Sequence, residues 1–222
     1  MMTKDEYVAR AAAESDWAPG WLAIDAAFDA LYPGVTPPHK GAPFEARAIF
    51  GGQEYIDGYS LFPSPNGYQH LLTYGMSTLY VDPESYGGDF SGWGYEMTMK
   101  VRADDPDDCI WAINSLSNLG RYTYTAKAWF EPFQFINGRN QPLRTDSNTQ
   151  LTSYITVPDT EVGGIDTVHG RVDFVQLVGI TQPELDWVAE GGTERATELV
   201  RRIAEDGNPH LVTDLARSHS YI

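Results

Sequence analysis

The side chains most able to act as a general base or as a metal ligand in this sequence are its five histidines. They are His39, His70, His169, His210 and His219. No two of them have the spacing that would place both on one face of a helix, so the sequence predicts no zinc site and no other metal site.

One candidate catalytic arrangement involves His169, Arg171 and Asp173, which alternate along a predicted strand. Alternate residues of a strand point to the same face, so a histidine base could stand beside a carboxylate. A hydrolase-like enzyme using His169 and Asp173 is therefore one alternative function. A solvated polar strand face is the preferred interpretation, because no nucleophile motif accompanies the three residues.

Other catalytic motifs are incomplete. Gly92-Trp93-Gly94 begins like a nucleotide-binding glycine loop, but a third glycine is absent and a strand rather than a helix follows. Cys109 lies among acids on the apolar side of a predicted helix, which favours a buried and unreactive thiol. We therefore predict no catalytic residue and no cofactor, and we favour a protein that is not an enzyme.

The segment of residues 80–93 offers binding chemistry instead, because it mixes aromatic and acidic side chains with glycines. Aromatic anchors among acids are typical of a binding hot spot for a basic protein. The predicted protein-binding residues are Tyr80, Asp82, Tyr86, Asp89 and Phe90. For Trp93, which lies between two glycines, a position in the core is favoured.

The charge of the chain narrows the class of partner. Its 15 lysines and arginines against 31 aspartates and glutamates give a formal charge of −16. Such a surface repels phosphates, so nucleic acid and anionic membranes are not expected as direct partners. It would speed encounter with a basic protein, although acidity that serves only solubility is an alternative interpretation.

The 222 residues, 42% of them hydrophobic, fit one domain over residues 1–222, with a peripheral helix within residues 1–20. The single Cys109 cannot form an intramolecular disulfide, and the first ten residues are too polar for a signal peptide. We therefore expect a cytoplasmic protein. The oligomeric state is left open, and a structural role in a larger assembly is a further alternative.

The elements that must position these residues follow from hydrophobic spacing and from turn residues. Helices are predicted over residues 5–14, 21–31, 105–119 and 196–204 and from the Thr181 capping box to the residue before Gly191. Strands are predicted over residues 44–50, 55–62, 68–74, 95–101, 151–157, 172–180 and 211–215. Residues 172–180 are apolar enough for a central strand.

Several segments, in matching order, carry a resemblance to a known family. Residues 70–80, His-Leu-Leu-Thr-Tyr-Gly-Met-Ser-Thr-Leu-Tyr, followed by residues 91–98, Ser-Gly-Trp-Gly-Tyr-Glu-Met-Thr, resemble the signature of suppressor of fused domains. Residues 164–185 and 210–215 are similar to later parts of the family pattern. The resemblance runs from about Trp21 to the carboxyl terminus.

This resemblance implies an α+β fold, with a mixed, mainly antiparallel sheet packed by helices, and a role in protein binding. Animal members hold a Gli transcription factor peptide as an added strand in a cleft that a second domain completes. Tyr80 matches a tyrosine of that peptide-contacting region, and Asp89 lies near an acidic contact position. Standalone bacterial members suggest an immunity protein that neutralises a toxin, here a basic one.

Overall fold

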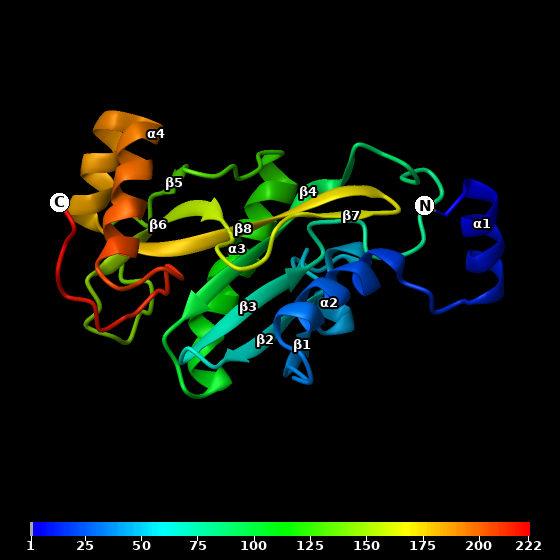
Figure 1. Cartoon of the computed structure of the whole chain (residues 1–222), viewed down its shortest axis with the longest axis horizontal. Coiled ribbons are helices and arrows are strands. Elements are labelled where there is room, and N and C mark those ends of the chain that lie inside the picture. The colour runs from blue at the N-terminus through cyan, green and yellow to red at the C-terminus, as the bar shows by residue number, and fades with distance from the viewer. Residues whose placement is uncertain (1) are drawn as a thin grey trace.

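The strands form where aromatic and β-branched residues crowd the sequence, and they pair into one mixed sheet (Figure 1). The structure is a computed structural model that describes residues 2–222. The strands are β1 (His39–Gly41), β2 (Gly58–Ser64), β3 (Tyr68–Tyr74), β4 (Phe90–Val101), β5 (Phe135–Ile136), β6 (Leu151–Pro158), β7 (Ile165–Thr167) and β8 (Gly170–Thr181). Their order is β1-β2-β3-β4-β8-β6-β5, and β7 also pairs with β8.

Neighbouring strands are antiparallel except β4 and β8, which run parallel. The apolar β8 lies between β4 and β6, so its predicted central position is confirmed. With the helices on both faces of this sheet, the fold is α+β, as predicted.

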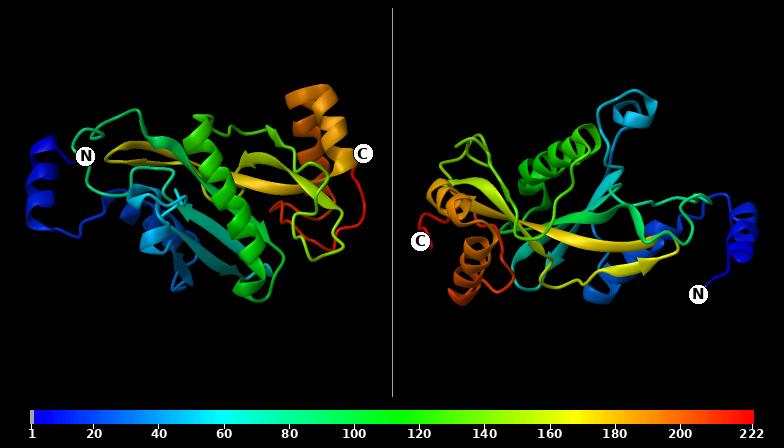
Figure 2. Two further views of the ribbon diagram at one scale, coloured as in Figure 1. Left: turned by 180° about the vertical axis from the view of Figure 1, so that it is seen from behind. Right: turned by 90° about the horizontal axis from the view of Figure 1, so that it is seen from above.

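Four helices surround the sheet, and their ends match local sequence signals. They are α1 (Lys4–Ala13), α2 (Pro19–Leu31), α3 (Ile110–Ala126) and α4 (Gln182–Glu205). Thr3 and Thr181 form the capping boxes of α1 and α4, and Pro19 opens α2. α2 covers one face and α3 the opposite face, while α4 and α1 lie at opposite ends of the molecule (Figures 1 and 2).

The two faces of the sheet hold separate cores. One core lies between the sheet and α3 and includes Met97 and Leu116, whereas the other lies against α2 and includes Phe28 and Phe174. A third cluster joins α4 to β6 and β8. Each fully buried large apolar side chain contributes about 1.5–3 kcal/mol through its removal from water. No helix within residues 2–222 is long and apolar enough to cross a membrane.

The predicted strand over residues 44–50 is wrong. Two short 3₁₀ turns, Phe44–Ala46 and Ala48–Phe50, replace it, and Gly51 ends the second in the left-handed conformation. Hydrogen bonds of 2.7 Å and 2.8 Å from the Ala48 and Glu54 amides to the Glu54 and Ala46 carbonyls fold the segment back on itself. These backbone amides are therefore hydrogen-bonded within the segment, and the segment does not join the sheet.

The predicted strand over residues 211–215 is also wrong. Leu211 has a φ of 53°, and the Asn208 side chain bonds both the amide and the carbonyl of Val212. Only one bridge, from Thr213 to Val101, reaches the sheet. The short strands β1, β5 and β7 were not predicted. The helix predicted to end before Gly191 and the helix predicted over residues 196–204 are confirmed as the two parts of α4, which are separated by non-helical backbone at Gly192.

Candidate functional site

Two glycines at the start of β4 shape the chain around the predicted binding residues. Gly92 and Gly94 have φ angles of 56° and 83°, which glycine adopts without steric cost. A Cβ atom on Gly92 would lie 2.7 Å from the Met76 carbonyl oxygen. The pairing of β4 with β8 shifts register between Phe90 and Tyr95. The resulting bulge leaves the Phe90 side chain 62% exposed, whereas Tyr95 is buried.

A groove of about 1030 Å³ lies beside Tyr80, and we call it the Tyr80 groove. Its aromatic walls come from three segments: Phe50 and Tyr55 precede β2, Tyr80 and Trp93 flank the start of β4, and Tyr124 belongs to α3. The rings of Tyr55 and Tyr124 stack with centroids 4.9 Å apart, and Trp93 meets Tyr124 edge-on. Tyr80 is 49% exposed, so its ring is available to a partner.

The charged groups of the Tyr80 groove are mainly acidic. Glu54, Asp57 and Asp82 line it together with Arg47, whose Nη1 lies 3.2 Å from an Asp57 carboxylate oxygen. Burial raises the pKa of Asp57, although the Arg47 charge opposes this effect. Burial, followed by the nearby Asp57 charge, also raises the pKa of Tyr80. The Tyr80 hydroxyl is therefore protonated and able to donate at neutral pH.

A second groove, of about 770 Å³, lies at Phe90, and we call it the Phe90 groove. Trp93, Trp129 and Phe130 supply half of its aromatic lining, and Trp129 is 55% exposed. The acidic side chains Glu131 and Asp173 are found at its edge, together with apolar residues such as Pro132, Pro158 and Val162. Gly92 and Trp93 line both grooves, so the two hollows meet at the start of β4.

The structure divides the five predicted binding residues between different places. Tyr80 and Asp82 line the Tyr80 groove, and Phe90 lines the Phe90 groove. The Asp82 carboxylate accepts hydrogen bonds from the Glu84 amide and the Ser85 hydroxyl, which lower its pKa, so it also shapes its own turn.

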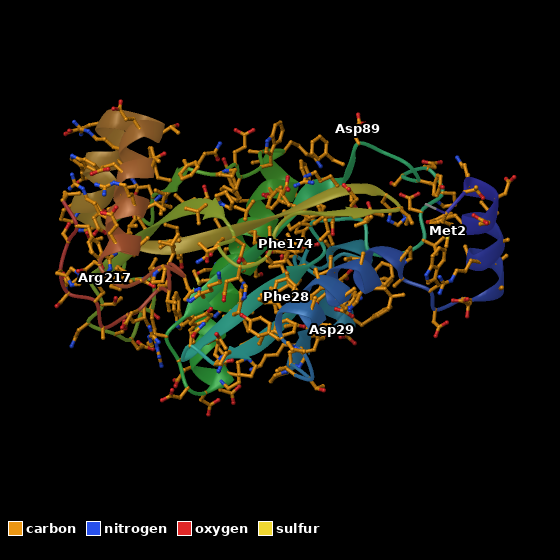
Figure 3. The ribbon with its side chains drawn as sticks, in the orientation of Figure 1. Met2, Phe28, Asp29, Asp89, Phe174 and Arg217 are labelled. Atoms are coloured by element: carbon orange, nitrogen blue, oxygen red, sulfur yellow. The ribbon has the colours of Figure 1, made fainter. Side chains whose placement is uncertain are left out.

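The other two predicted residues do not line either groove. The Tyr86 ring packs against Tyr7 with centroids 5.0 Å apart, and its hydroxyl donates to the Met2 carbonyl. Asp89 is exposed and points outward at the edge of the molecule (Figure 3). Its carbonyl oxygen accepts a bond from the Arg171 amide, so only its carboxylate is open to a partner.

Sequence reasoning underestimated Trp93 and missed the residues that complete the grooves. Trp93 is only partly buried, so its expected core position is only partly correct. Tyr124 and Trp129 come from the end of α3 and from the chain after it, far from residue 80 in sequence. The neighbouring pair Trp129-Phe130 was a visible aromatic signal, but its exposure depends on contacts that the sequence does not display.

A buried carboxylate supports the floor of the Tyr80 groove. Glu96 is fully buried and accepts hydrogen bonds from the amides of Gly75, Met76 and Ser77 and from the hydroxyls of Thr73 and Ser77, at 2.6–3.3 Å. Burial raises its pKa, and the Ser77 and Thr73 hydrogen bonds oppose that effect. Glu96 therefore satisfies the backbone and hydroxyl donors of the neighbouring chain.

A second buried polar cluster lies behind the Phe90 groove. The side chains of His70, Lys100 and Asp159 are inaccessible to solvent, and the Asp159 carboxylate contacts His70 Nε2 at 2.9 Å and Lys100 Nζ at 3.0 Å. Burial alone would raise the pKa of Asp159, but the His70 hydrogen bond and the nearby charges hold it far below its usual value. Because Asp159 also accepts from the amides of Glu161 and Val162, this cluster fixes one wall of the groove.

The three residues of the candidate catalytic arrangement are not assembled into one site. His169 is buried, and its ring contacts the Tyr7 hydroxyl and the Thr78 carbonyl oxygen at 2.9 Å and 3.1 Å. Asp173 instead pairs with Arg171 on the surface at 2.8 Å. Among residues 2–222, no three His, Cys, Asp or Glu side chains come together as a metal site.

The chain is similar to proteins of one family. Residues 52–218 match the family described as suppressor of fused protein. Suppressor of fused homologues of Homo sapiens and Mus musculus are each 27% identical to it over 200 residues, which cover 82% of this chain and 41% of the relative. The chain thus matches less than half the length of these relatives.

Solved structures share the fold. A chain from the Sufu–Fu complex has a TM-score of 0.79 at 24% identity, with 92% of this chain and 93% of that chain covered. Drosophila suppressor of fused gives 0.79 at 24% identity, covering 92% of this chain and 51% of the other. A homologue from Neisseria gonorrhoeae gives 0.62 at 14% identity, covering 91% and 97%. At these identities the likeness concerns the fold.

Proposed function

Because this chain belongs to the suppressor of fused family, we propose that it is a non-catalytic protein-interaction domain. Its binding surface is formed by the Tyr80 groove and the Phe90 groove, together with the exposed carboxylate of Asp89. The Sufu–Fu complex supports this proposal, because a chain of the same fold there forms a complex with another protein.

The observation that carries the proposal is the meeting of two aromatic grooves at Gly92 and Trp93. Tyr80, Phe90 and Trp129 are large aromatic side chains that remain about half or more exposed. Exposed aromatic side chains that gather around a groove mark an interaction site, because soluble domains rarely expose large apolar patches. Together the grooves offer room for an extended segment of a partner.

We propose a basic protein as the partner. The carboxylates of Asp57, Asp82, Glu131 and Asp173 border the two grooves, and the whole chain carries a charge of −16. Complementary charge speeds the encounter and steers the orientation of the two proteins. In the specific role that we propose, the chain is an immunity protein in the cytoplasm that neutralises a basic toxin; the single cysteine agrees with a reducing compartment.

The test begins with capture of the partner from native cells by the full chain, followed by affinity measurement with the purified partner. The double variant Tyr80→Ala/Phe90→Ala should bind at least a hundredfold more weakly, since hot-spot aromatic residues each contribute about 2 kcal/mol or more. The matched control is Ile110→Ala/Tyr122→Ala, which removes two similarly exposed apolar side chains from α3. Equal affinity of both double variants for the partner would refute this surface.

The immunity role has a separate readout. Co-expression of the captured partner with the chain should relieve growth arrest, and the Tyr80→Ala/Phe90→Ala variant should not. A partner without toxicity would contradict the immunity role and leave the interaction surface standing.

A further inference from the structure

We infer that Tyr7 is a positioning residue for residues 80–89, here called the 80–89 loop. Through Tyr7, α1 acts as a clamp that holds this loop in place, and the contact between Tyr7 and His169 keeps the clamp closed. The effect of this clamp on partner binding rests on the proposed function, because the loop carries Tyr80 and Asp89. The clamp itself rests only on contacts within the chain.

The helix α1 is anchored by one side chain. Tyr7 is fully buried, whereas Val8 is 48% exposed and the charged residues of the helix face solvent. The Tyr7 ring packs among Trp17, Tyr86 and His169, with centroid distances of 5.1, 5.0 and 5.7 Å. A helix held in this way depends on a single aromatic socket for its position.

The hydroxyl of Tyr7 joins two segments that are distant in sequence. It accepts a hydrogen bond from the Asp82 amide at 2.7 Å and lies 2.9 Å from His169 Nε2. His169 Nδ1 lies 3.1 Å from the Thr78 carbonyl oxygen, which can only accept, so Nδ1 carries the proton. In the neutral ring, Nε2 then accepts from the Tyr7 hydroxyl, and every polar atom in the chain of contacts has a partner.

These contacts hold the loop at several points. Thr78 precedes the loop, Asp82 lies near its start, and Tyr86 in its middle reaches back to the Met2 carbonyl. Met2 lies beside α1 at the end of the molecule where the loop emerges (Figure 3). The amino-terminal segment therefore determines where the loop leaves the sheet, although it precedes the residues 52–218 that match the family.

The clamp requires a neutral imidazole. The groups that face His169 are the Tyr7 hydroxyl of α1, the carbonyl of Thr78, the Asp82 charge of the loop and, from its own turn, Thr167. Burial lowers the pKa of His169, and the Thr78 hydrogen bond and the Asp82 charge only partly oppose it. A proton on Nε2 would remove the acceptor of the Tyr7 hydroxyl. The closed state thus loses stability as the pH falls below about 6.5, the value of an exposed histidine.

The test is amide hydrogen exchange on the full chain at pH 7.5, comparing Tyr7→Phe with wild type. The informative amides are those of Gly87 and Gly88, which bond to the Val168 and Ser85 carbonyls and do not touch Tyr7. Their protection should fall about tenfold, the equivalent of one lost buried hydrogen bond. The matched control is Tyr122→Phe, which removes a hydroxyl from an exposed ring on α3.

A change confined to the Asp82 amide would overturn the inference, because that amide merely loses its own acceptor. An equal loss of protection at the amides of β3 would also overturn the inference, since the variant would then weaken the whole fold. A second arm measures protection factors of Gly87 between pH 7.5 and 5.5. Protection should fall with acid in wild type and stay level in His169→Gln, which keeps an acceptor but does not titrate; parallel curves would count against the clamp.

The clamp and the binding surface can fail separately. If the clamp exists and the surface is correctly placed, Tyr7→Phe lowers both loop protection and the affinity for the captured partner. If partner affinity is insensitive to Tyr80→Ala/Phe90→Ala while Gly87 protection still falls in Tyr7→Phe, the clamp stands and the proposed surface does not.

Discussion

The two halves of strand β4 show how one strand can serve both binding and folding. Its outer half, residues 90–94, contains two glycines in the left-handed conformation and leaves Phe90 exposed in the Phe90 groove. Its inner half, residues 95–101, is buried at every position and pairs with β3 and β8. In the outer half the Phe90 side chain is exposed and Trp93 is partly exposed, although Ser91 is buried, whereas every side chain of the inner half is engaged within the domain.

The inner half is unusual because one of its two faces is polar. Tyr95, Met97 and Met99 face the core under α3, while Glu96 and Lys100 on the other face are fully buried. Such groups are tolerated only where each is fully hydrogen-bonded or paired, as they are here. Substitution of inner-half side chains should therefore cost folding free energy, whereas substitution of the exposed Phe90 side chain in the outer half should cost mainly partner affinity.

The largest expected effect on the free energy of unfolding is that of Lys100→Ala. It would leave the Asp159 carboxylate buried without its ammonium partner at 3.0 Å, and breaking such a pair costs about 3–5 kcal/mol of unfolding free energy. Urea unfolding followed by circular dichroism measures this loss. The control is Arg171→Ala, which breaks the exposed pair with Asp173 and should cost under about 1 kcal/mol. Similar losses in both variants would refute the contrast between buried and exposed ion pairs.

A smaller effect on the free energy of unfolding is expected at Gly92, within the outer half. Alanine there would adopt a left-handed φ of 56° and place its Cβ 2.7 Å from the Met76 carbonyl oxygen. We expect a loss of about 1–3 kcal/mol of unfolding free energy. Gly87→Ala separates the two causes, since Gly87 has a φ of 72° but nothing within 4 Å of a Cβ atom. Gly92→Ala should be the more damaging variant in the same urea measurement.

Acid should reduce the free energy of unfolding, because it protonates Asp159, the partner of Lys100 in the inner half. The folded-state pKa of Asp159 lies below that of an ordinary aspartate, so its contribution is present above about pH 3.9 and is lost as the pH falls toward the folded-state value. The slope approaches about 1.4 kcal/mol per pH unit for this one proton. Comparison of urea unfolding of wild type and Asp159→Asn from pH 5 to pH 3 isolates it. Identical slopes in the two proteins would contradict this role of Asp159.

Regular elements with a strong pattern could be predicted from the sequence. The spacing of Ile24, Phe28 and Leu31 predicted α2. The apolar run of β8 predicted its central place in the sheet, and the Thr181 capping box predicted the start of α4. These features arise from neighbouring residues, so local sequence carries them. The segment 44–50 had equally suitable strand residues, but local hydrogen bonds to residues 46–54 determined its conformation.

The candidate site could be predicted only in part, because it is assembled from distant segments. The exposed Tyr80 and Phe90 came from one aromatic and acidic stretch, while Tyr124 and Trp129 join them only through the packing of α3. The pairing of Lys100 with Asp159 spans 59 residues and left no local signal. Tyr86 was predicted to contact a partner, yet its ring packs against Tyr7. The spacing of residues in the sequence does not indicate this contact.

The smallest expected effect on folding is that of Phe90→Ala, and it gives the sharpest comparison with the inner half. The Phe90 ring is 62% exposed, whereas Tyr95 is 3% exposed in the same strand. Unfolding free energy should change by less than about 0.5 kcal/mol for Phe90→Ala, and fall by about 3–5 kcal/mol for Tyr95→Ala, as for other large aromatic residues. A loss for Phe90→Ala near that of Tyr95→Ala would show that the ring packs into the fold. A negligible loss for Phe90→Ala would support our proposal that this exposed ring contacts a partner.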